Sequence, residues 1–306
     1  MSARILDGRG VASRLWRDLS ARVEELKERS GHSPRLATVR FQETGPSAVY
    51  AASLSRAARS VGIEPVEVIV PGSVAFPDLA ARIGALNRDP TVSGIVLAQP
   101  LPAHLDAAAV LDLVEPDKDV DGATALNAGR LSRGRAAFAP ATALAVMAIL
   151  DAHQVQVEGR RAVVIGRSAV VGRPVASLLL NRDATVVVCH RRTRNLARET
   201  RRAEILVVAA GQPRLVRAEM VNRGAVVVDC GINTTAEGIV GDVDYAAVRP
   251  VVRAITPVPG GVGPVTTMMV LRQTIDAAER LAGEPDPMQQ RFVSVPTPTG
   301  PSAEPR

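Results

Sequence analysis

The sequence predicts an α/β fold with two domains, and three observations support that prediction. Short apolar runs alternate with segments of helical period along most of the 306 residues, a pattern that builds parallel sheets through right-handed crossovers. One apolar run stops at Gly166, and a polar turn then leads to a second glycine, Gly172, where a helix opens that we expect to continue through Leu180. The length also suits two domains or one large α/β domain.

The first half of the chain contains the elements of one parallel sheet. Residues 8–28 have the period of a long amphipathic helix, with Val11, Leu15, Leu19, Val23 and Leu26 on one face. We expect strands at 36–41, 66–70 and 94–98, and helices at 47–61, 77–86 and 107–114. Residues 116–122, PDKDVDG, are too charged and turn-prone for a core, so we interpret them as a functional loop.

The second half predicts a second sheet. A helix at 142–154 leads into strands at 161–166, 184–189, 204–208 and 225–228, with helices between them. The last helix, 264–281, is of a kind that folds back onto the first domain. We therefore expect an N-terminal domain over 1–140, completed by helix 264–281, and a second domain over 141–263. The proline-rich tail at 283–306 cannot bury a core, and we expect it to be disordered.

The turn that begins at Gly166 has the features of a phosphate-binding site. Glycine allows a tight turn and lets backbone N–H groups approach an anion, and the following helix offers the positive end of its dipole. The spacing departs from the dinucleotide fingerprint G-x-G-x-x-G. The next strand ends in HRRT at 190–193, where an arginine accepts a 2′-phosphate, which favours NADP over NAD. The alternative is that an arginine-rich chain has arginine on any exposed turn.

Composition excludes several classes of partner. The net charge of +6 is scattered along the chain, few aromatic residues are present, and no nucleic-acid module is visible. No apolar run is long enough for a membrane span, and the N-terminus lacks the hydrophobic segment of a signal peptide. We therefore expect a cytoplasmic protein that binds neither nucleic acid nor membrane. Cys189 and Cys230 follow apolar runs and read as buried thiols, without a disulfide or a metal site.

Three segments rich in glycine, proline or acidic residues fall where strands end. They are residues 99–102, the acidic loop around Asp121, and residues 256–264, TPVPGGVGP. In a two-domain α/β enzyme, ligands bind at the carboxyl ends of the strands. Prolines stiffen such loops, and glycines let the backbone approach a ligand closely. The sequence therefore predicts that these three segments line a cleft.

These motifs resemble the tetrahydrofolate dehydrogenase/cyclohydrolase family. The matching segments, spread over residues 3–281, are ILDG at 5–8, PDKDVDG at 116–122, GRSAVVGRP at 166–174, VDCGIN at 228–233 and TPVPGGVGP at 256–264. The resemblance implies a homodimer in which a three-layer catalytic domain that binds folate faces a Rossmann-type NADP domain across a cleft. It also implies oxidation of 5,10-methylenetetrahydrofolate with NADP, and then hydrolysis of the methenyl product to 10-formyltetrahydrofolate.

The resemblance assigns roles to individual residues. Tyr50 matches the tyrosine that stacks on folate, and Asp121 matches the aspartate that holds the pterin ring, where a carboxylate can accept two N–H bonds. The alternatives are a core tyrosine and a loop-capping aspartate. The other folate-binding positions are Gln99, Pro100, Leu101, Pro259, Gly260 and Gly261. The NADP-binding positions are Gly166, Arg167, Ser168, Gly172, Pro174, His190, Arg191, Thr193, Ala210, Gly211, Ile232 and Thr266.

Two positions depart from the family pattern. The family has a lysine one helical turn after the tyrosine and on the same face, where this chain has Leu54. The family segment V-Q-L-P-L-P has a glutamine where this chain has Ala98, and Gln99 is displaced by one residue toward the opposite face. The only lysines are Lys27 and Lys118. Two partners of one network are therefore lost together, with no obvious substitute.

The two reaction steps depend on these positions to different degrees. Hydride transfer mainly needs proximity and orientation, whereas hydrolysis needs an activated water and a proton route, help worth roughly 10²–10⁴ in rate. We therefore expect an NADP-dependent dehydrogenase whose cyclohydrolase step is weak or lost. Two alternatives stay open, a non-catalytic homologue that binds folate or nucleotide and an NADP oxidoreductase repurposed for another substrate.

Overall fold

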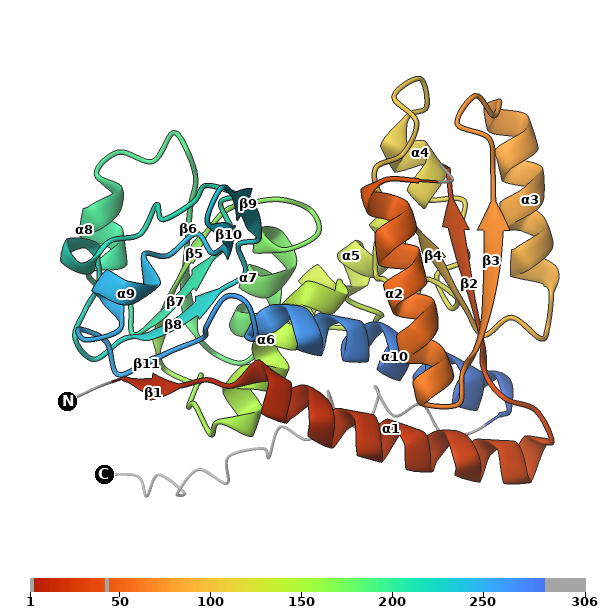
Figure 1. Ribbon diagram of the computed structural model, residues 1–306, viewed down its shortest axis with the longest axis horizontal. Helices are drawn as coiled ribbons and strands as arrows, with labels where there is room; N and C mark the ends of the chain where they lie inside the picture. The colour runs from red at the N-terminus through yellow and green to blue at the C-terminus, as the bar shows by residue number, and fades with distance from the viewer. Residues whose placement is uncertain (1–2, 42–43, 284–306) are drawn as a thin grey trace, which may run out of the picture.

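The structure is a computed structural model that describes residues 3–41 and 44–283, and Figure 1 shows its arrangement. The tail that we expected to be disordered lies, apart from Gly283, outside the described residues. Within the described part of the chain, the longer strands form two separate parallel sheets. Figure 1 shows the larger sheet at the left and the smaller one at the right, with two long helices that start between the sheets and run beneath the smaller one.

The smaller sheet has the strand order β3-β2-β4. Its strands are β2 (Arg35–Arg40), β3 (Glu64–Ile69) and β4 (Gly94–Leu97), as the apolar runs predicted. The helices of this region are α2 (Pro46–Ser60), α3 (Phe76–Arg88), α4 (Ala107–Leu111) and α5 (Ala125–Ser132). Helix α5 was not predicted; it has only eight residues, and one of them is Gly129, a residue type of low helix propensity.

Strands β2 and β4 of this sheet are buried on both faces, and neighbouring residues of each strand point to opposite faces. Leu36 and Val96 pack in the same core as Leu54 of α2. Their neighbours Ala37 and Ile95 pack on the other side, in the core that contains Leu79 and Ile83 of α3 and Val110 of α4. The sheet is therefore the middle layer of three, as expected for this part of the chain.

The larger sheet has the order β1-β11-β8-β7-β5-β6. Its strands are β1 (Arg4–Ile5), β5 (Arg161–Ile165), β6 (Thr185–Cys189), β7 (Ile205–Val208), β8 (Val226–Asp229) and β11 (Ala254–Ile255). The remaining elements are α7 (Gly172–Leu180), α8 (Leu196–Thr200), the short η1 (Ala218–Met220), the antiparallel pair β9 (Asn233–Thr235) and β10 (Gly238–Val240), and α9 (Tyr245–Val248). The sequence did not predict β9, β10 or β11.

Strand β1 differs from the expectation that residues 1–140 belong to one unit. Arg4 and Ile5 pair in parallel with Ala254 and Ile255 of β11, so the start of the chain extends the sheet of the second half. A strand of two residues has no periodicity to reveal it. Its partner is fixed by contacts about 250 positions away, which sequence patterns do not report.

Three helices join the two sheets, namely α1 (Gly8–Ser30), α6 (Ala141–Ala152) and α10 (Val262–Leu281). Helices α1 and α10 run side by side in Figure 1, from between the two sheets to beneath the smaller one, and α10 also packs against α6. Asp7 caps α1 by accepting hydrogen bonds from the N–H groups of Arg9 and Gly10 at 3.0 and 3.1 Å. The predicted return of the last helix toward the first half of the chain is confirmed.

Two further findings concern the described residues as a whole. Their helices are all too short or too polar to cross a bilayer. Histidine, cysteine, aspartate and glutamate side chains form no group of three that could hold a metal ion within residues 3–41 and 44–283.

Candidate functional site

The turn between β5 and α7 depends on two glycines. Gly166 has φ +114°, and a Cβ there would lie 2.0 Å from the carbonyl oxygen of Ala209. A Cβ on Gly172 would lie 2.2 Å from the carbonyl oxygen of Gly166. These approaches have no room for a side chain. The helix opens at Gly172 and ends at Leu180, so the predicted strand, turn and helix are confirmed.

A pocket of about 520 Å³ lies at the carboxyl ends of β5, β6 and β7. Its lining combines apolar side chains with two arginines and contains no acidic residue. The lining residues are Ile165, Gly166, Arg167, Ser168, His190, Arg191, Thr193, Leu196, Ala209, Ala210, Gln212 and Leu215. The turn after β6 contributes His190 and Thr193 to this lining, and the N–H of His190 donates to the Thr193 hydroxyl at 2.8 Å. Apolar walls, glycine-based backbone access and arginines fit a dinucleotide that carries a 2′-phosphate.

Seven of the sequence-predicted NADP residues line this pocket, as the list above shows. Gly172 and Pro174 are buried inside the first turns of α7, behind the lining. Gly211 is exposed and follows the lining residue Ala210. Ile232 is exposed beyond the end of β8, and Thr266 lies in α10, where its hydroxyl donates to Val262. These last positions are not brought into the pocket.

Asp242, a buried residue that the sequence did not single out, holds the loop after β7. Its carboxylate accepts hydrogen bonds from the N–H groups of Ala210, Gly211 and Gln212 at 2.6, 2.8 and 2.9 Å. The Asn233 side chain donates to the same carboxylate at 2.8 Å. An aspartate beside glycine reads as a turn residue, so no sequence signal pointed to this contact.

Asp229 supports Asp242 in turn. Its carboxylate accepts from the N–H groups of Gly231, Asp242 and Val243 at 2.8, 3.1 and 2.9 Å. Burial raises the pKa of Asp229 to about 6, although its hydrogen bonds act in the opposite direction. Burial also raises the pKa of the adjacent Cys230 thiol, so this cysteine remains protonated. The two carboxylates therefore fix the backbone that borders the pocket.

Tyr50 and Asp121 form the second part of the candidate site. Tyr50 is 37% exposed on α2, but burial of its hydroxyl and the charge of Asp121 both raise its pKa. Burial, followed by the charge of Asp119, raises the pKa of Asp121 to about 7. Two residues predicted from separate segments therefore interact electrostatically. A carboxyl group with this pKa changes its charge near neutral pH.

The loop that carries Asp121 is fixed by its neighbours. Asp119 forms a parallel bridge with Ile95, which brings the loop beside β4. Its carboxylate accepts from the backbone and hydroxyl of Thr124 and from the Asn127 side chain, at 2.8 to 2.9 Å. The Lys118 side chain is directed to the end of α3 instead, where its ammonium donates to the carbonyls of Leu86 and Asp89 at 3.1 and 2.6 Å. Asp119 is thus a structural residue that sequence reasoning missed.

Leu54 and Ala98 are both buried, each with 1% of its surface exposed. Leu54 lies one helical turn after Tyr50 on α2 and belongs to the main hydrophobic core. Ala98 follows β4 directly, and its N–H donates to the Val39 carbonyl at 2.8 Å. Gln99 is exposed, so the two neighbours point in different directions. Neither of these two buried positions therefore carries an ionisable side chain.

The other predicted folate-binding positions lie on two loops. Pro100 and Leu101 follow β4, while Pro259, Gly260 and Gly261 precede α10. The second loop is packed tightly against the start of α1, since the N–H of Gly8 donates to the Gly260 carbonyl at 3.0 Å. A Cβ on Gly8 would lie 1.8 Å from the Gly261 carbonyl oxygen. The ILDG motif and the glycine-rich loop are therefore in direct backbone contact.

Comparison with known proteins covers nearly all of the described chain. Residues 6–121 match the family model for the tetrahydrofolate dehydrogenase/cyclohydrolase catalytic domain, and residues 140–282 match that for its NAD(P)-binding domain. The bifunctional protein FolD of Psychrobacter arcticus is 42% identical over 92% of this chain and 96% of the relative. The bifunctional protein FolD of Chloroflexus aggregans is 45% identical over 92% of this chain and 100% of the relative.

Solved structures agree with this result. The bifunctional enzyme FolD-methylenetetrahydrofolate dehydrogenase/cyclohydrolase of Campylobacter jejuni has a TM-score of 0.89 at 39% identity, over 91% of this chain and 99% of the other. The Trypanosoma brucei N5,N10-methylenetetrahydrofolate dehydrogenase-cyclohydrolase, complexed with NADP cofactor and inhibitor, has a TM-score of 0.86 at 38% identity, over 92% and 98%. Sequence models, relatives and folds thus agree over both halves, and the chain belongs to the tetrahydrofolate dehydrogenase/cyclohydrolase family.

Proposed function

We propose that this protein oxidises 5,10-methylenetetrahydrofolate with NADP and that the second step of its family, hydrolysis of the methenyl product, is weak or lost. The observation that carries the second half of the proposal is the burial of Leu54 in the hydrophobic core, one helical turn after Tyr50. An aliphatic side chain neither accepts nor relays a proton. The family resemblance implies a lysine at that position.

Neither lysine of the chain can take over this role. The Lys118 ammonium is engaged by two backbone carbonyls between α3 and the acidic loop. Lys27 is exposed in the last turn of α1, which Figure 1 shows running away from the start of α10. Arg56, two residues after Leu54, is exposed on α2, and a guanidinium remains protonated near neutral pH. None of these three side chains is therefore placed to replace the lysine.

The remaining residues suit binding and orientation. The Asp121 carboxylate would accept two N–H bonds from the aminopyrimidine edge of the pterin, and the Tyr50 ring would stack on the folate. Arg167, Ser168 and Arg191 would hold the phosphate groups of NADP beside the glycine turn. When bound, NADP supplies the hydride acceptor. These contacts provide proximity without providing a base for water, which favours the first step over the second.

The proposal is tested by assaying the two steps separately. The purified protein is given 5,10-methylenetetrahydrofolate and NADP, and NADPH formation is followed. In a second assay it is given 5,10-methenyltetrahydrofolate, and loss of the methenyl absorbance is compared with the rate in buffer alone. We expect NADPH to form, while the methenyl species disappears at close to the buffer rate.

The double variant Leu54→Lys, Ala98→Gln provides the matched test of cause. We expect it to accelerate methenyl hydrolysis by roughly 10²-fold or more, the usual contribution of general acid–base help. Rapid hydrolysis by the unmodified protein would contradict the loss of the second step. Binding of both ligands without any NADPH would instead indicate a non-catalytic homologue or an enzyme for another substrate.

The family resemblance also carries our proposal of a cytoplasmic homodimer. Light scattering coupled to size-exclusion chromatography measures the mass in solution directly. We expect a mass of twice 32.2 kDa. A monomeric mass at micromolar concentration would contradict the dimer.

A further inference from the structure

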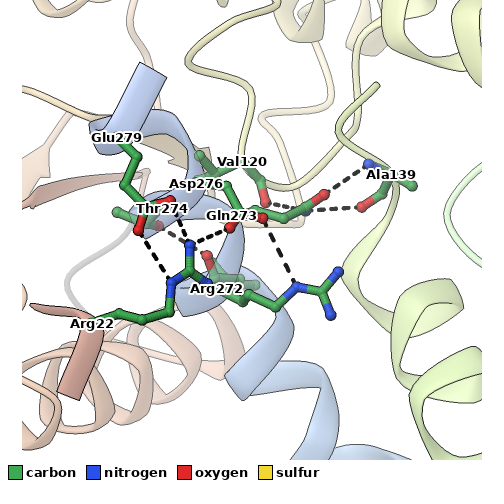
Figure 2. Close-up of polar contacts among 9 residues, drawn as sticks. Arg22, Val120, Ala139, Arg272, Gln273, Thr274, Asp276 and Glu279 are labelled. Carbon is green, nitrogen blue, oxygen red and sulfur yellow. Dashed lines mark hydrogen bonds and ion pairs between the residues drawn. The ribbon is translucent and has the colours of Figure 1, made fainter. Parts of the chain in front are cut away.

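Gln273, near the middle of α10, is a buried polar residue for which the proposed reaction has given no role. Only 1% of its surface is exposed. Figure 2 shows its side-chain amide reaching from α10 to two separate backbone segments. Its Nε2 group donates to the Val120 carbonyl at 2.7 Å and to the Ala139 carbonyl at 3.0 Å. Its Oε1 atom accepts from the N–H of Ala139 at 2.9 Å.

The two segments that Gln273 joins are both close to the candidate site. Val120 directly precedes Asp121 in the acidic loop. Ala139 lies just before α6, where the chain passes from the smaller sheet to the larger one. A buried amide with all of these bonds made is stable, while removal of the amide would leave three buried backbone groups without partners.

The acidic loop and the connecting segment also touch each other directly. Gly122 has φ +62°, and a Cβ there would lie 2.3 Å from the carbonyl carbon of Ala139. A glycine is required at this contact because of both the conformation and the space. The position of Asp121 relative to residues 139–140 therefore depends on a close backbone contact and on one glutamine.

Helix α10 itself is held firmly against α1. Figure 2 also shows Arg22 of α1, whose guanidinium donates to Asp276 at 2.7 Å and to both carboxylate oxygens of Glu279 at 2.7 and 3.1 Å. Asp276 and Glu279 lie on α10, within two turns of Gln273. The helix that carries Gln273 is therefore a rigid support, and the same helix begins at the glycine-rich loop of the site.

We propose that Gln273 is a positioning residue for folate binding: it fixes the Asp121 loop against the segment that connects the two sheets, so that the Asp121 carboxylate stands ready to meet the pterin ring. The inference rests on the proposed role of Asp121. Gln273 itself does not touch substrate. Its effect on folate should greatly exceed its effect on NADP, because the dinucleotide pocket lies at the carboxyl ends of β5, β6 and β7, and neither Gln273 nor its partners Val120 and Ala139 line that pocket.

The test uses Gln273→Leu with Thr274→Val as its matched control. Thr274 is the next residue of α10 and is equally buried, but its hydroxyl donates within the helix, to the Val270 carbonyl at 2.9 Å. Both variants remove a buried polar group from the same helix. Only the first removes contacts with the acidic loop. Calorimetric titration with 5,10-methylenetetrahydrofolate in saturating NADPH, which cannot accept a hydride, measures folate affinity without turnover.

We expect Gln273→Leu to weaken folate binding by roughly tenfold, with NADP affinity within about twofold of the original protein, and Thr274→Val to change neither. Hydrogen exchange in the ligand-free protein gives a readout that does not depend on folate. The amides of residues 120–123 and 139 should exchange faster in Gln273→Leu and not in Thr274→Val. Gln273→Asn, whose amide is one methylene shorter, should resemble Gln273→Leu.

Three outcomes would overturn the inference. If folate and NADP affinities fall together, or if Thr274→Val has the same effect as Gln273→Leu, the role of Gln273 is general packing of α10. If neither exchange nor folate affinity changes, the loop does not depend on Gln273. Faster exchange of residues 120–123 with unchanged folate affinity would show that Asp121 does not hold folate, and this result would separate a failure of the proposed function from a failure of the loop contact.

Discussion

At the scale of single residues, the charge of Asp121 links the site to pH. Burial and the neighbouring Asp119 raise the pKa of its carboxyl group to about 7, compared with about 3.9 in an unfolded chain. Tyr50 faces the same group and remains a neutral phenol, because its own pKa is raised. The carboxylate form, which would accept two N–H bonds from a pterin, is therefore complete only above pH 7.

The first prediction concerns folate affinity as a function of pH. We expect the affinity to rise from pH 6 to pH 8, with a midpoint near 7, because ionised Asp121 is the binding form. Titration with 5,10-methylenetetrahydrofolate in saturating NADPH at several pH values measures this dependence. Asp121→Asn should bind more weakly and lose the dependence. An unchanged pH profile in that variant would assign the titration to another group.

The second prediction concerns stability, where the sign is opposite. The unfolded chain gives up this proton more easily than the folded protein, so the carboxyl group destabilises the fold increasingly from about pH 4 to 7, and fully above that. We therefore expect Asp121→Asn to raise Tm more at pH 8 than at pH 5, as measured by calorimetry. An equal shift at both pH values would contradict the raised pKa.

At the scale of elements, the turn between β5 and α7 is specified by close backbone approach. A Cβ on Gly172 would lie 2.2 Å from the Gly166 carbonyl oxygen, so neither the strand end nor the helix start can hold its position if a side chain is added. The family fingerprint differs from the usual dinucleotide spacing, yet the physical requirement is the same. Five residues, RSAVV at 167–171, separate the two glycines, and none of them is glycine.

The third prediction follows from this contact. We expect Gly172→Ala to weaken NADP binding by roughly tenfold or more and to destabilise the fold, since the backbone must shift to make room. Gly129→Ala in α5 is the matched control, because its Cβ meets nothing within 4 Å, and the higher helix propensity of alanine should stabilise the protein by roughly 0.5–1 kcal/mol. NADP titration and urea unfolding measure both effects. Equal NADP affinities in the two variants would show that NADP binding does not depend on the close approach of Gly172 to Gly166.

At the scale of the whole molecule, α1, α6 and α10 make one support for both sheets. The Arg22 contact with Asp276 and Glu279 ties α1 to α10, and the two acidic side chains are only 4% and 10% exposed. Gln273 lies about one helical turn before Asp276 on α10. Its side chain ties α10 to the acidic loop. The cleft loops are therefore positioned by helices that come from opposite ends of the chain.

The fourth prediction tests this support. Arg22→Ala removes the guanidinium shared by the two buried carboxylates and leaves Asp276 with only the longer contact to Arg272, at 3.9 Å. We expect it to lower the free energy of unfolding by roughly 2 kcal/mol. Arg182→Ala is the matched control, since Arg182 pairs with Asp151 at the surface, with side chains 40% and 54% exposed, and should cost less than about 1 kcal/mol. Urea unfolding followed by circular dichroism measures both. Equal losses would show that the α1–α10 pair is only a surface contact.

The sequence by itself determined the alternation of strands and helices, the glycine turn, the family and the absence of a lysine after Tyr50. These features are local: an apolar period, a glycine where a turn needs one, or a residue type at a fixed spacing can each be read without knowing the fold. The predicted bounds of α7, Gly172 to Leu180, match the structure for this reason.

Only the tertiary structure decided which distant segments meet. It joined β1 to β11, directed Lys118 toward backbone carbonyls, set Asp242 against the loop after β7, and brought Gln273 to Val120. Each contact joins positions far apart in the chain or depends on the direction of a buried polar side chain. A buried polar group gains its role from the partners that surround it, and those partners become neighbours only when the chain folds.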